Sequence, residues 1–406
     1  MKRTTDYYKI AMLVIITIMI TLLVSSVVIY NYFRSNPNVK YVLAQNEDGT
    51  TDLEAAIKNM RAIIDQYYLY SDDIDENDMV EGAIKGYVEG LGDEYTSYMS
   101  KEDWEEFKED NLGTYIGLGV YMSGQENGAL IEYVYKDSPA DKNDIKEGDI
   151  ITKVDHITVT KDNLSDATKY IRTGTVGTTF KVEVLRDGKT FTKTIKREIV
   201  RTAPIESEML ENNIGYMYIF TFDELCAQDF EENYKELKEQ GAKELIIDLR
   251  NNTGGVLQET IDIAEMMLDK GDKILVSHNR ENGETVYTSK TKDEVEIPVV
   301  VLMNEYSASA SEVLAGALQD NKRAKIIGTK SYGKGVMQEV LSLSNGGALK
   351  ITTEEFVSPN GNKINEVGIT PDIEIEIPEE YPNIMYVPED EDNQLKRAIE
   401  ELKKEI

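Results

Sequence analysis

The sequence predicts an α/β fold with a largely parallel central sheet, preceded by a strand-rich domain and a helical block. From residue 214 onward, short apolar runs rich in β-branched residues alternate with helical stretches. This alternation indicates parallel strands with helices on the sheet faces. Between 113 and 201 the apolar runs are short and separated by turn residues. The 406 residues exceed the size of one hydrophobic core, which rarely grows past about 250 residues, so we expect several domains.

An uncharged segment covers residues 10–30 and follows a short basic N-terminus. About 20 apolar residues span a bilayer as a helix, whereas a secretory signal peptide has a shorter apolar core followed closely by a cleavage site. We therefore expect a retained signal anchor rather than a cleaved peptide. Residues 1–9 would be cytoplasmic, 10–30 a single-pass transmembrane helix, 31–50 a polar linker, and the rest of the chain would lie outside the cell membrane.

The next region is acidic and helical. Residues 46–110 carry 20 acidic and 5 basic side chains. Apolar residues recur at helical spacing in 51–69 and 77–91, and a short acidic helix surrounds Trp104. We interpret 51–112 as a helical domain with a solvated acidic face rather than an acidic recognition surface.

The remaining elements follow from the same patterns. For a domain at 113–201 we expect strands at 116–122, 129–135, 149–154 and 180–185 and a helix at 163–172. For a domain at 202–380 we expect strands at 214–220, 244–249, 297–303 and 324–328, and helices at 227–240, 257–270 and 310–320. The acidic tail, 381–406, contains an amphipathic helix at 391–406, which either docks on the core or mediates formation of a homodimer.

Composition excludes several classes of function. The formal net charge of -31 argues against nucleic acid as a partner, because binding to phosphates needs clustered Lys and Arg. A single cysteine, Cys226, excludes an intramolecular disulfide, a Cys-rich zinc site and a redox CxxC motif. The chain has two histidines, His156 and His278, which leaves few candidates for a Ser-His-Asp triad. His156 lies in the strand-rich region, and His278 follows a different strand from the one that leads to the candidate nucleophile.

Three unusual loops follow strands of the predicted parallel sheet. One contains Gly254 and Gly255, one contains Ser309 at the start of a helix, and one contains Lys334 between two glycines. Because the carboxyl ends of parallel strands share one edge, the three loops should meet there. A serine needs a base to become a nucleophile, and a desolvated lysine can serve as that base. Backbone N–H groups at a helix start and in a glycine turn can stabilise an oxyanion.

Each loop also has a simpler interpretation. Ser309-x-x-Glu312 matches a helix capping box, so Ser309 could be only an N-cap. The glycine pair could be an ordinary turn, and Lys334 could be a surface lysine. The occurrence of all three at converging strand ends favours a serine hydrolase.

Four segments of the α/β region resemble the carboxy-terminal processing peptidases, serine proteases with a Ser-Lys dyad and a PDZ domain. They are LRNNTGGVL (249–257), NEYSASASEVLAGALQD (304–320), GTKSYGKGVMQ (328–338) and PNGNKINEVGITPD (359–372). Three earlier segments resemble the same family: GAIKGYVEGLGDEYTSYM (82–99) its helical segment, and YIGLGV (115–120) and SPADKNDIKEGDIITKV (138–154) its PDZ domain. The resemblance implies a ClpP/crotonase-like protease core at 202–380, a PDZ domain at 113–201 that is inserted in or precedes it, and a helical cap.

The resemblance also implies roles for individual residues. Ser309 would be the nucleophile, Lys334 the general base and Gln338 the residue that orients the lysine. The oxyanion donors would be the backbone N–H groups of Ala310 and Gly255, with the choice between Gly254 and Gly255 left open. Arg250 would support the glycine loop. No metal or organic cofactor is needed.

In the PDZ domain, the loop Tyr115-Ile116-Gly117-Leu118-Gly119 would bind the carboxylate of a peptide that adds as a strand. The implied substrates are proteins with accessible, apolar C-termini, and the family implies that PDZ docking controls access to the dyad.

Two other classes of protein remain as alternatives. A PDZ adaptor with an inactive protease fold predicts loss of dyad residues, but Ser309, Lys334 and Gln338 are all present. A ligand-binding protein is the second alternative, because the same fold family includes retinoid binders; that role would leave the Ser-Lys pair unnecessary.

Overall fold

The computed structural model describes residues 17–28, 52–281, 283–291, 294–378, 381, 387–388 and 390–404. The chain divides into two compact units, Met1–Val80 and Glu81–Ile406.

The first unit contains helices. Residues 17–28 are helical, α2 spans Leu53–Tyr67, η1 spans Ser71–Asp73, and α3 (Glu76–Glu89) begins in this unit. The guanidinium of Arg61 pairs with Asp65 within α2 and with Glu76 at the start of α3. The helices predicted at 51–69 and 77–91 are therefore present, with slightly shorter bounds.

Of the predicted membrane helix at 10–30, residues 17–28 are described and the others are not, and the predicted linker at 31–50 lies outside the described residues. Within the ranges given above, no helix has both the length and the apolar composition needed to cross a membrane. The membrane helix stays a prediction.

The second unit is built around a six-stranded sheet that is mostly parallel, as the sequence predicts. β10 runs antiparallel to β11, and every other neighbouring pair is parallel. The strand order is β10 (Ile205–Leu210), β11 (Ile214–Ile219), β12 (Glu244–Asp248), β15 (Val299–Met303), β16 (Ala324–Gly328) and β19 (Ile373–Glu374), with η3 (Glu211–Asn213) between β10 and β11.

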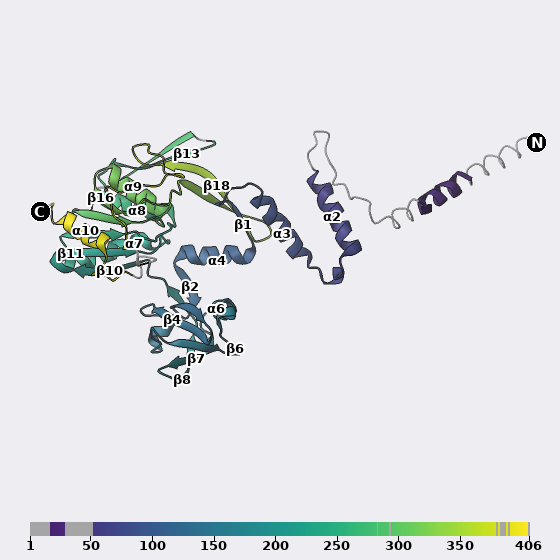
Figure 1. Ribbon diagram of the computed structural model, residues 1–406, viewed down its shortest axis with the longest axis horizontal. Helices are drawn as coiled ribbons and strands as arrows, with labels where there is room; N and C mark the ends of the chain where they lie inside the picture. The colour runs from purple at the N-terminus through teal and green to yellow at the C-terminus, as the bar shows by residue number, and fades with distance from the viewer. Residues whose placement is uncertain are drawn as a thin grey trace, which may run out of the picture. The chain divides into compact units, whose positions relative to one another are not determined.

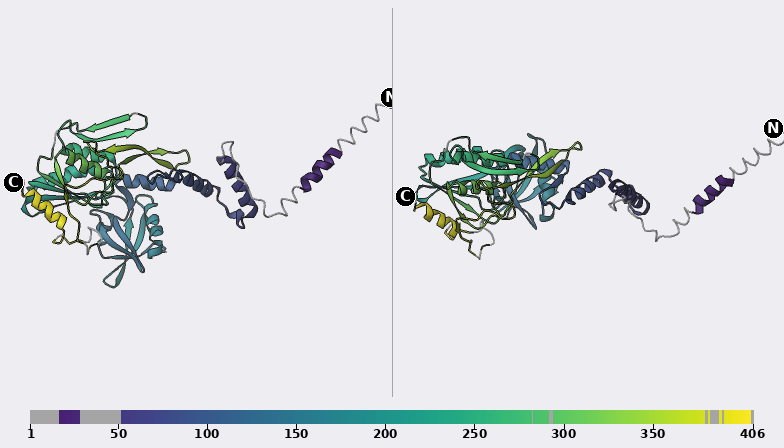
Figure 2. Two further views of the ribbon diagram at one scale, coloured as in Figure 1. Left: turned by 45° about the horizontal axis from the view of Figure 1, so that its top comes forward. Right: turned by 90° about the horizontal axis from the view of Figure 1, so that it is seen from above.

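Helices cover both faces of this sheet (Figure 1). Alternate residues of each strand enter different cores: Ile247 packs with α7 (Cys226–Glu239), α8 (Leu257–Met267) and α9 (Ala310–Asp320), whereas Ile246 packs with α10 (Asn393–Leu402). This two-sided burial explains why β12 and β15 are continuous apolar runs. Of the two roles considered for the C-terminal helix, docking on the core is the one observed, against the face opposite α7 to α9 (Figure 2); dimerisation stays untested.

A second sheet was not predicted from the sequence. It orders β1 (Ser97–Met99), β18 (Ala348–Val357), β13 (Lys273–Asn279) and β14 (Gly283–Thr288), and β17 (Val336–Ser342) also pairs with β18. Its strands carry many charged and polar side chains, and in β18 only Ala348 and Phe356 are buried. Because most of β18 is only half covered, the apolar run that normally marks a strand is missing.

The strand-rich domain has its own sheet and its own apolar core. The sheet runs β3 (Val120–Gln125), β4 (Gly128–Val134), β5 (Ile150–Val154), β7 (Thr179–Arg186) and β8 (Lys189–Lys196), with β6 (Ile157–Thr158) beside β5. Its helices are α5 (Pro139–Lys142), η2 (Lys161–Asn163) and α6 (Leu164–Arg172). The strand predicted at 116–122 is divided at Leu118 and Gly119, because Gly119 adopts a φ of 81°.

This domain is inserted in the α/β core rather than placed before it. β1, which precedes the domain in the chain, pairs with β18 of the core, and α4 (Lys101–Leu112) follows β1. β2 (Thr114–Gly117) pairs with β9 (Glu198–Arg201), so the chain enters and leaves the domain through neighbouring strands.

Candidate active site

The three loops singled out by the sequence meet at one pocket of about 370 Å³. The loop after β12 contributes Gly255, the start of α9 contributes Ser309 and Ala310, and the loop after β16 contributes Lys334. Gln338 from β17 also lines the pocket. The convergence expected from a parallel sheet is therefore observed.

Ser309 has an unusual backbone. Its φ and ψ are 55° and -113°, a region that residues with a Cβ rarely occupy. Such conformations persist where surrounding contacts hold them, and they cluster at functional sites. Here the Ser309 N–H donates to Glu312 Oε2 (2.8 Å), and the Ala308 N–H donates to the carbonyl of Asn252 (3.0 Å). Ser309 is the N-cap residue of α9, as the simpler interpretation expected, but an ordinary N-cap has an extended backbone.

Glu312 connects the serine loop to the lysine loop, a role that sequence reasoning missed. Its carboxylate is fully buried and accepts four hydrogen bonds. The donors are Ser331 Oγ (2.6 Å) and the N–H groups of Ser309 (2.8 Å), Gly333 (2.7 Å) and Lys334 (2.8 Å). Burial raises the pKa of Glu312, and these hydrogen bonds oppose the rise. The Ser-x-x-Glu spacing was the available signal, but it indicated only a cap.

Lys334 is half-buried, and its environment favours the neutral amine. Burial lowers its pKa, and the positive charge of Lys350, which lines the same pocket, lowers it further. Glu312 acts in the opposite direction. The Lys334 ammonium lies 4.9 Å from the centre of the Tyr95 ring. The sequence pattern identified neither Tyr95 nor Lys350. Lys350 lies in β18 of the second sheet, which was not predicted, and Tyr95 lies in the turn before β1 of the same sheet.

The glycines around Lys334 are required by close backbone contacts. A Cβ on Gly335 would lie 2.2 Å from the backbone nitrogen of Asn365. Gly333 has a φ of 95°, which disfavours any other residue. The Gly-Lys-Gly motif therefore fixes the lysine loop against residues 365–368.

Gln338 reaches the pocket through an irregularity in β17. The pairing of β17 with β18 shifts register between Met337 and Gln338, and both residues line the pocket. Consecutive strand residues normally face opposite sides, and a bulge changes that direction. The Gln338 amide donates to Thr352 Oγ1 (3.2 Å).

Two backbone N–H groups at the pocket are available for an oxyanion. The Gly254 N–H donates to Asn252 Oδ1 (2.8 Å), and the Ser309 N–H is taken by Glu312. Within the described ranges, the N–H groups of Gly255 and Ala310 donate to no protein acceptor. This geometry favours Gly255 over Gly254 as a candidate donor.

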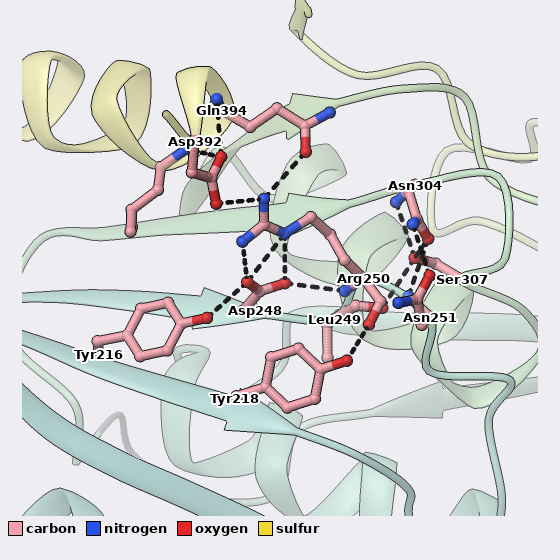
Figure 3. A network of polar contacts seen from close by, with 11 residues as sticks. Tyr216, Tyr218, Asp248, Leu249, Arg250, Asn251, Asn304, Ser307, Asp392 and Gln394 are labelled. Carbon is pink, nitrogen blue, oxygen red and sulfur yellow. Dashed lines mark hydrogen bonds and ion pairs between the residues drawn. The ribbon is translucent and has the colours of Figure 1, made fainter. Parts of the chain in front are cut away.

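Arg250 lies at the base of the glycine loop, but its guanidinium points away from it (Figure 3). It bonds Asp248 Oδ1 and Oδ2 (each 2.9 Å from Nε), Asp392 Oδ2 (2.8 Å) and Gln394 Oε1 (3.1 Å). The supporting role that the resemblance implies for Arg250 stays a prediction; the partners of its guanidinium come from the end of β12 and from the C-terminal segment.

The predicted carboxylate-binding loop begins within β2, which contains Tyr115 to Gly117, and its last two residues, Leu118 and Gly119, lie between β2 and β3. The carbonyl of Leu118 accepts from the Ala140 N–H (2.8 Å), which ties the loop to α5. Burial raises the pKa of the Tyr115 hydroxyl to about 12, and the nearby N–H groups of Val120 and Gly119 limit the rise. The Tyr115 ring lies under the Arg172 guanidinium, 4.9 Å away. Ile116 and Gly117 pair with β9 and are not free to bind a peptide strand on that side.

Profiles of three known families match the chain. The profile of Peptidase family S41 matches residues 213–375, that of the PDZ domain matches 117–196, and that of the Activating protease CtpB N-terminal domain matches 22–103. The carboxy-terminal processing protease CtpA of Bacillus subtilis is 32% identical over 352 residues, which cover 86% of this chain and 74% of that protein. The chain belongs to the carboxy-terminal processing proteases of peptidase family S41. The resemblance noted in the sequence is thereby confirmed.

Further comparisons agree with this membership. The "Probable CtpA-like serine protease" of Staphylococcus haemolyticus is 34% identical over 312 residues, 76% of this chain, and the match spans 62% of the length of that relative. A crystal structure assigned to an S41 protease of Bacteroides fragilis has a TM-score of 0.53 at 17% identity and covers 85% of this chain and 97% of that one. This last similarity supports the fold.

Proposed function

We propose that this family member is a membrane-anchored serine endopeptidase that processes the C-terminal tails of proteins. The observation that carries the proposal is the pocket in which Ser309, Lys334 and two unengaged backbone N–H groups lie together. A nucleophile, a base with a lowered pKa and oxyanion donors are the groups that peptide hydrolysis needs.

In the proposed mechanism, Lys334 takes the proton of Ser309 Oγ as that oxygen attacks the scissile carbonyl. The oxyanion of the tetrahedral intermediate accepts hydrogen bonds from the N–H groups of Gly255 and Ala310. The Lys334 ammonium then donates its proton to the leaving amine, and water hydrolyses the acyl-enzyme by the reverse sequence of proton transfers. Gln338 is assigned to orient the lysine. The proposed steps use only the side chains of Ser309, Lys334 and Gln338 and two backbone N–H groups.

The PDZ domain is assigned to bind the substrate. A peptide C-terminus would add as a strand beside β3, with its carboxylate at the N–H groups of the loop from Tyr115 to Gly119. Leu118 is buried in the PDZ core cluster, with Val120 packed against it. This apolar floor fits the expected preference for apolar C-termini.

The anchor is proposed from the uncharged segment at 10–30 and its basic flank. Alkaline extraction of membranes tests it: the full chain should remain with the membrane, and a chain lacking residues 2–30 should be released. Release of the full chain would contradict the anchor but not the peptidase.

The peptidase is tested with an unstructured polypeptide that ends in apolar residues. We expect the parent to cleave it, and Ser309→Ala and Lys334→Ala to lose at least about 10³-fold in kcat/KM, within the range seen when a catalytic group is removed. Lys330→Ala is the matched control, because Lys330 is exposed in the same loop as Lys334. Parent-like cleavage by either dyad variant would contradict the assignment, and no cleavage by the parent would favour an inactive PDZ adaptor.

A further inference from the structure

The start of the C-terminal helix is linked directly to the end of β12. Asp392 Oδ1 caps α10 by accepting from the N–H groups of Gln394 (3.0 Å) and Leu395 (2.9 Å). Its other oxygen accepts from Arg250 Nη1 (2.8 Å), and Gln394 Oε1 accepts from the same nitrogen (3.1 Å). Gln394 Nε2 in turn donates to the carbonyl of Ile375 (2.6 Å). We name Asp248, Arg250, Asp392 and Gln394 the Arg250 network (Figure 3).

The Arg250 network is almost dry. The exposed fractions are 2% for Arg250, 0% for Asp248, 5% for Asp392 and 0% for Gln394. A buried charge must keep its partners, because no water is available to replace them. The guanidinium is therefore held in one position by two carboxylates and one amide, and two of these three groups, Asp392 and Gln394, belong to the C-terminal segment.

The chain runs directly from Arg250 to the pocket, and hydrogen bonds fix it at two points on the way. Its neighbour Asn251 exchanges two hydrogen bonds with Asn304, one from the Asn251 N–H (2.9 Å) and one from Asn304 Nδ2 (2.8 Å). Asn252 follows, and its Oδ1 accepts from the Gly254 N–H (2.8 Å). The next residue, Gly255, lines the pocket with an N–H that has no acceptor in the described part of the chain.

The Arg250 backbone is itself fixed at this point. Its N–H donates to Asp248 Oδ1 (2.9 Å), and its carbonyl accepts from the Tyr218 hydroxyl (2.8 Å). The Asp248 carboxylate thus holds both the guanidinium of Arg250 and the backbone from which the glycine loop starts, so the two are coupled through Asp248.

We propose that Asp392 and Gln394 of the C-terminal helix are positioning residues of the active site, which hold the oxyanion loop in place through Arg250. This inference rests on the proposed function, in which the Gly255 N–H stabilises the oxyanion. The C-terminal helix thus completes the active site from the opposite face of the sheet and contacts none of the reacting groups.

Docking of the helix does not itself require the charge of Asp392. Leu395, Ala398 and Leu402 are buried against the sheet, so apolar contacts keep α10 in place. Asp392→Asn is therefore an informative variant. Asparagine is as good an N-cap as aspartate, but its amide cannot pair both the helix N–H groups and the guanidinium as a carboxylate does.

The experiment compares the full-length parent with Asp392→Asn and with Asp390→Asn, a control at an exposed acidic residue two positions earlier. Steady-state cleavage gives kcat and KM, and a peptide boronate that forms a tetrahedral serine adduct reports on the oxyanion site. Hydrogen exchange of residues 250–257 reports on the loop without requiring activity. Binding of an apolar C-terminal peptide to the PDZ domain serves as an internal reference.

For Asp392→Asn we expect kcat and boronate affinity to fall about tenfold, less than the roughly 10²- to 10³-fold loss caused by removing an oxyanion donor outright. KM and PDZ binding should stay at the parent values, and the loop should exchange faster while exchange of β12 is unchanged. Gln394→Glu, which restores a carboxylate beside Arg250, should recover part of kcat when combined with Asp392→Asn. Unchanged kcat and unchanged loop exchange would overturn the proposal. If the parent itself does not cleave, the proposed function fails, and the exchange result alone decides whether the helix holds the loop.

Discussion

Replacing Glu312 with glutamine should disrupt both loops that carry the proposed dyad. Each of the two Glu312 carboxylate oxygens accepts two hydrogen bonds: one from the buried Ser331 Oγ and Gly333 N–H, the other from the half-buried N–H groups of Ser309 and Lys334. A glutamine amide has one oxygen and one NH2 group, so it can accept from only two of these donors and presents hydrogens to the other two.

The magnitude follows from the donors left without acceptors. A buried unsatisfied donor costs about 1–3 kcal/mol, so two of them predict a loss of roughly 2–6 kcal/mol in the free energy of unfolding. Cleavage activity should fall by more than the loss of folded protein alone explains, because the backbone N–H groups of both Ser309 and Lys334 bond to Glu312. A displacement of about 1 Å can cost on the order of 10²-fold in rate. We expect kcat/KM of the folded fraction to fall by about that factor.

Urea unfolding followed by fluorescence measures the stability of Glu312→Gln, and cleavage of an unstructured polypeptide under conditions where the variant is folded measures its activity. Glu305→Gln is the matched control. Glu305 is exposed in the loop between β15 and α9, which also contains Ser309, and it accepts one hydrogen bond from Thr329 Oγ1 (2.9 Å). Its unfolding free energy should change by no more than about 0.5 kcal/mol. If Glu312→Gln also stays within that limit and cleaves at the parent rate, the carboxylate does not anchor the two loops.

Three further outcomes are expected. Burial and the charge of Lys350 lower the pKa of Lys334, so kcat/KM should rise with pH as Lys334 loses its proton. Lys350→Met removes the neighbouring charge and should move this rise to higher pH. An unchanged pH profile would argue against electrostatic coupling between Lys350 and Lys334. Gly254→Ala should lower kcat/KM at least about tenfold, since the φ of Gly254 is 106° and the added Cβ would lie 2.9 Å from the Cβ of Ser309; parent-like cleavage would mean that the loop adapts. Hydrogen bonds from cationic neighbours, Lys404 first, lower the pKa of Glu401 from 4.5 to about 2, so the stability it contributes is present above pH 4.5 and is lost as pH falls toward 2. Thermal unfolding of Glu401→Gln should show less of this acid dependence, and an identical pH profile would contradict it.

Much of the fold was predictable because the strands of the central sheet are buried on both faces. β11, β12, β15 and β16 therefore appear as apolar runs, and the intervening helices have a clear apolar periodicity. The second sheet escaped prediction for the opposite reason. β17 and β18 are only partly covered, and their charged side chains hide the alternation.

The sequence by itself determined where the nucleophile and base candidates lie, because parallel topology brings Ser309 and Lys334 to one edge of the sheet. Only the tertiary structure decided which groups hold them. The donors that the lysine loop supplies to Glu312, the cation Lys350 beside the base and the Asp392 carboxylate on Arg250 come from segments far apart in the chain. No local pattern encodes such contacts, because each depends on burial and on hydrogen-bond partners that meet only after the chain has folded.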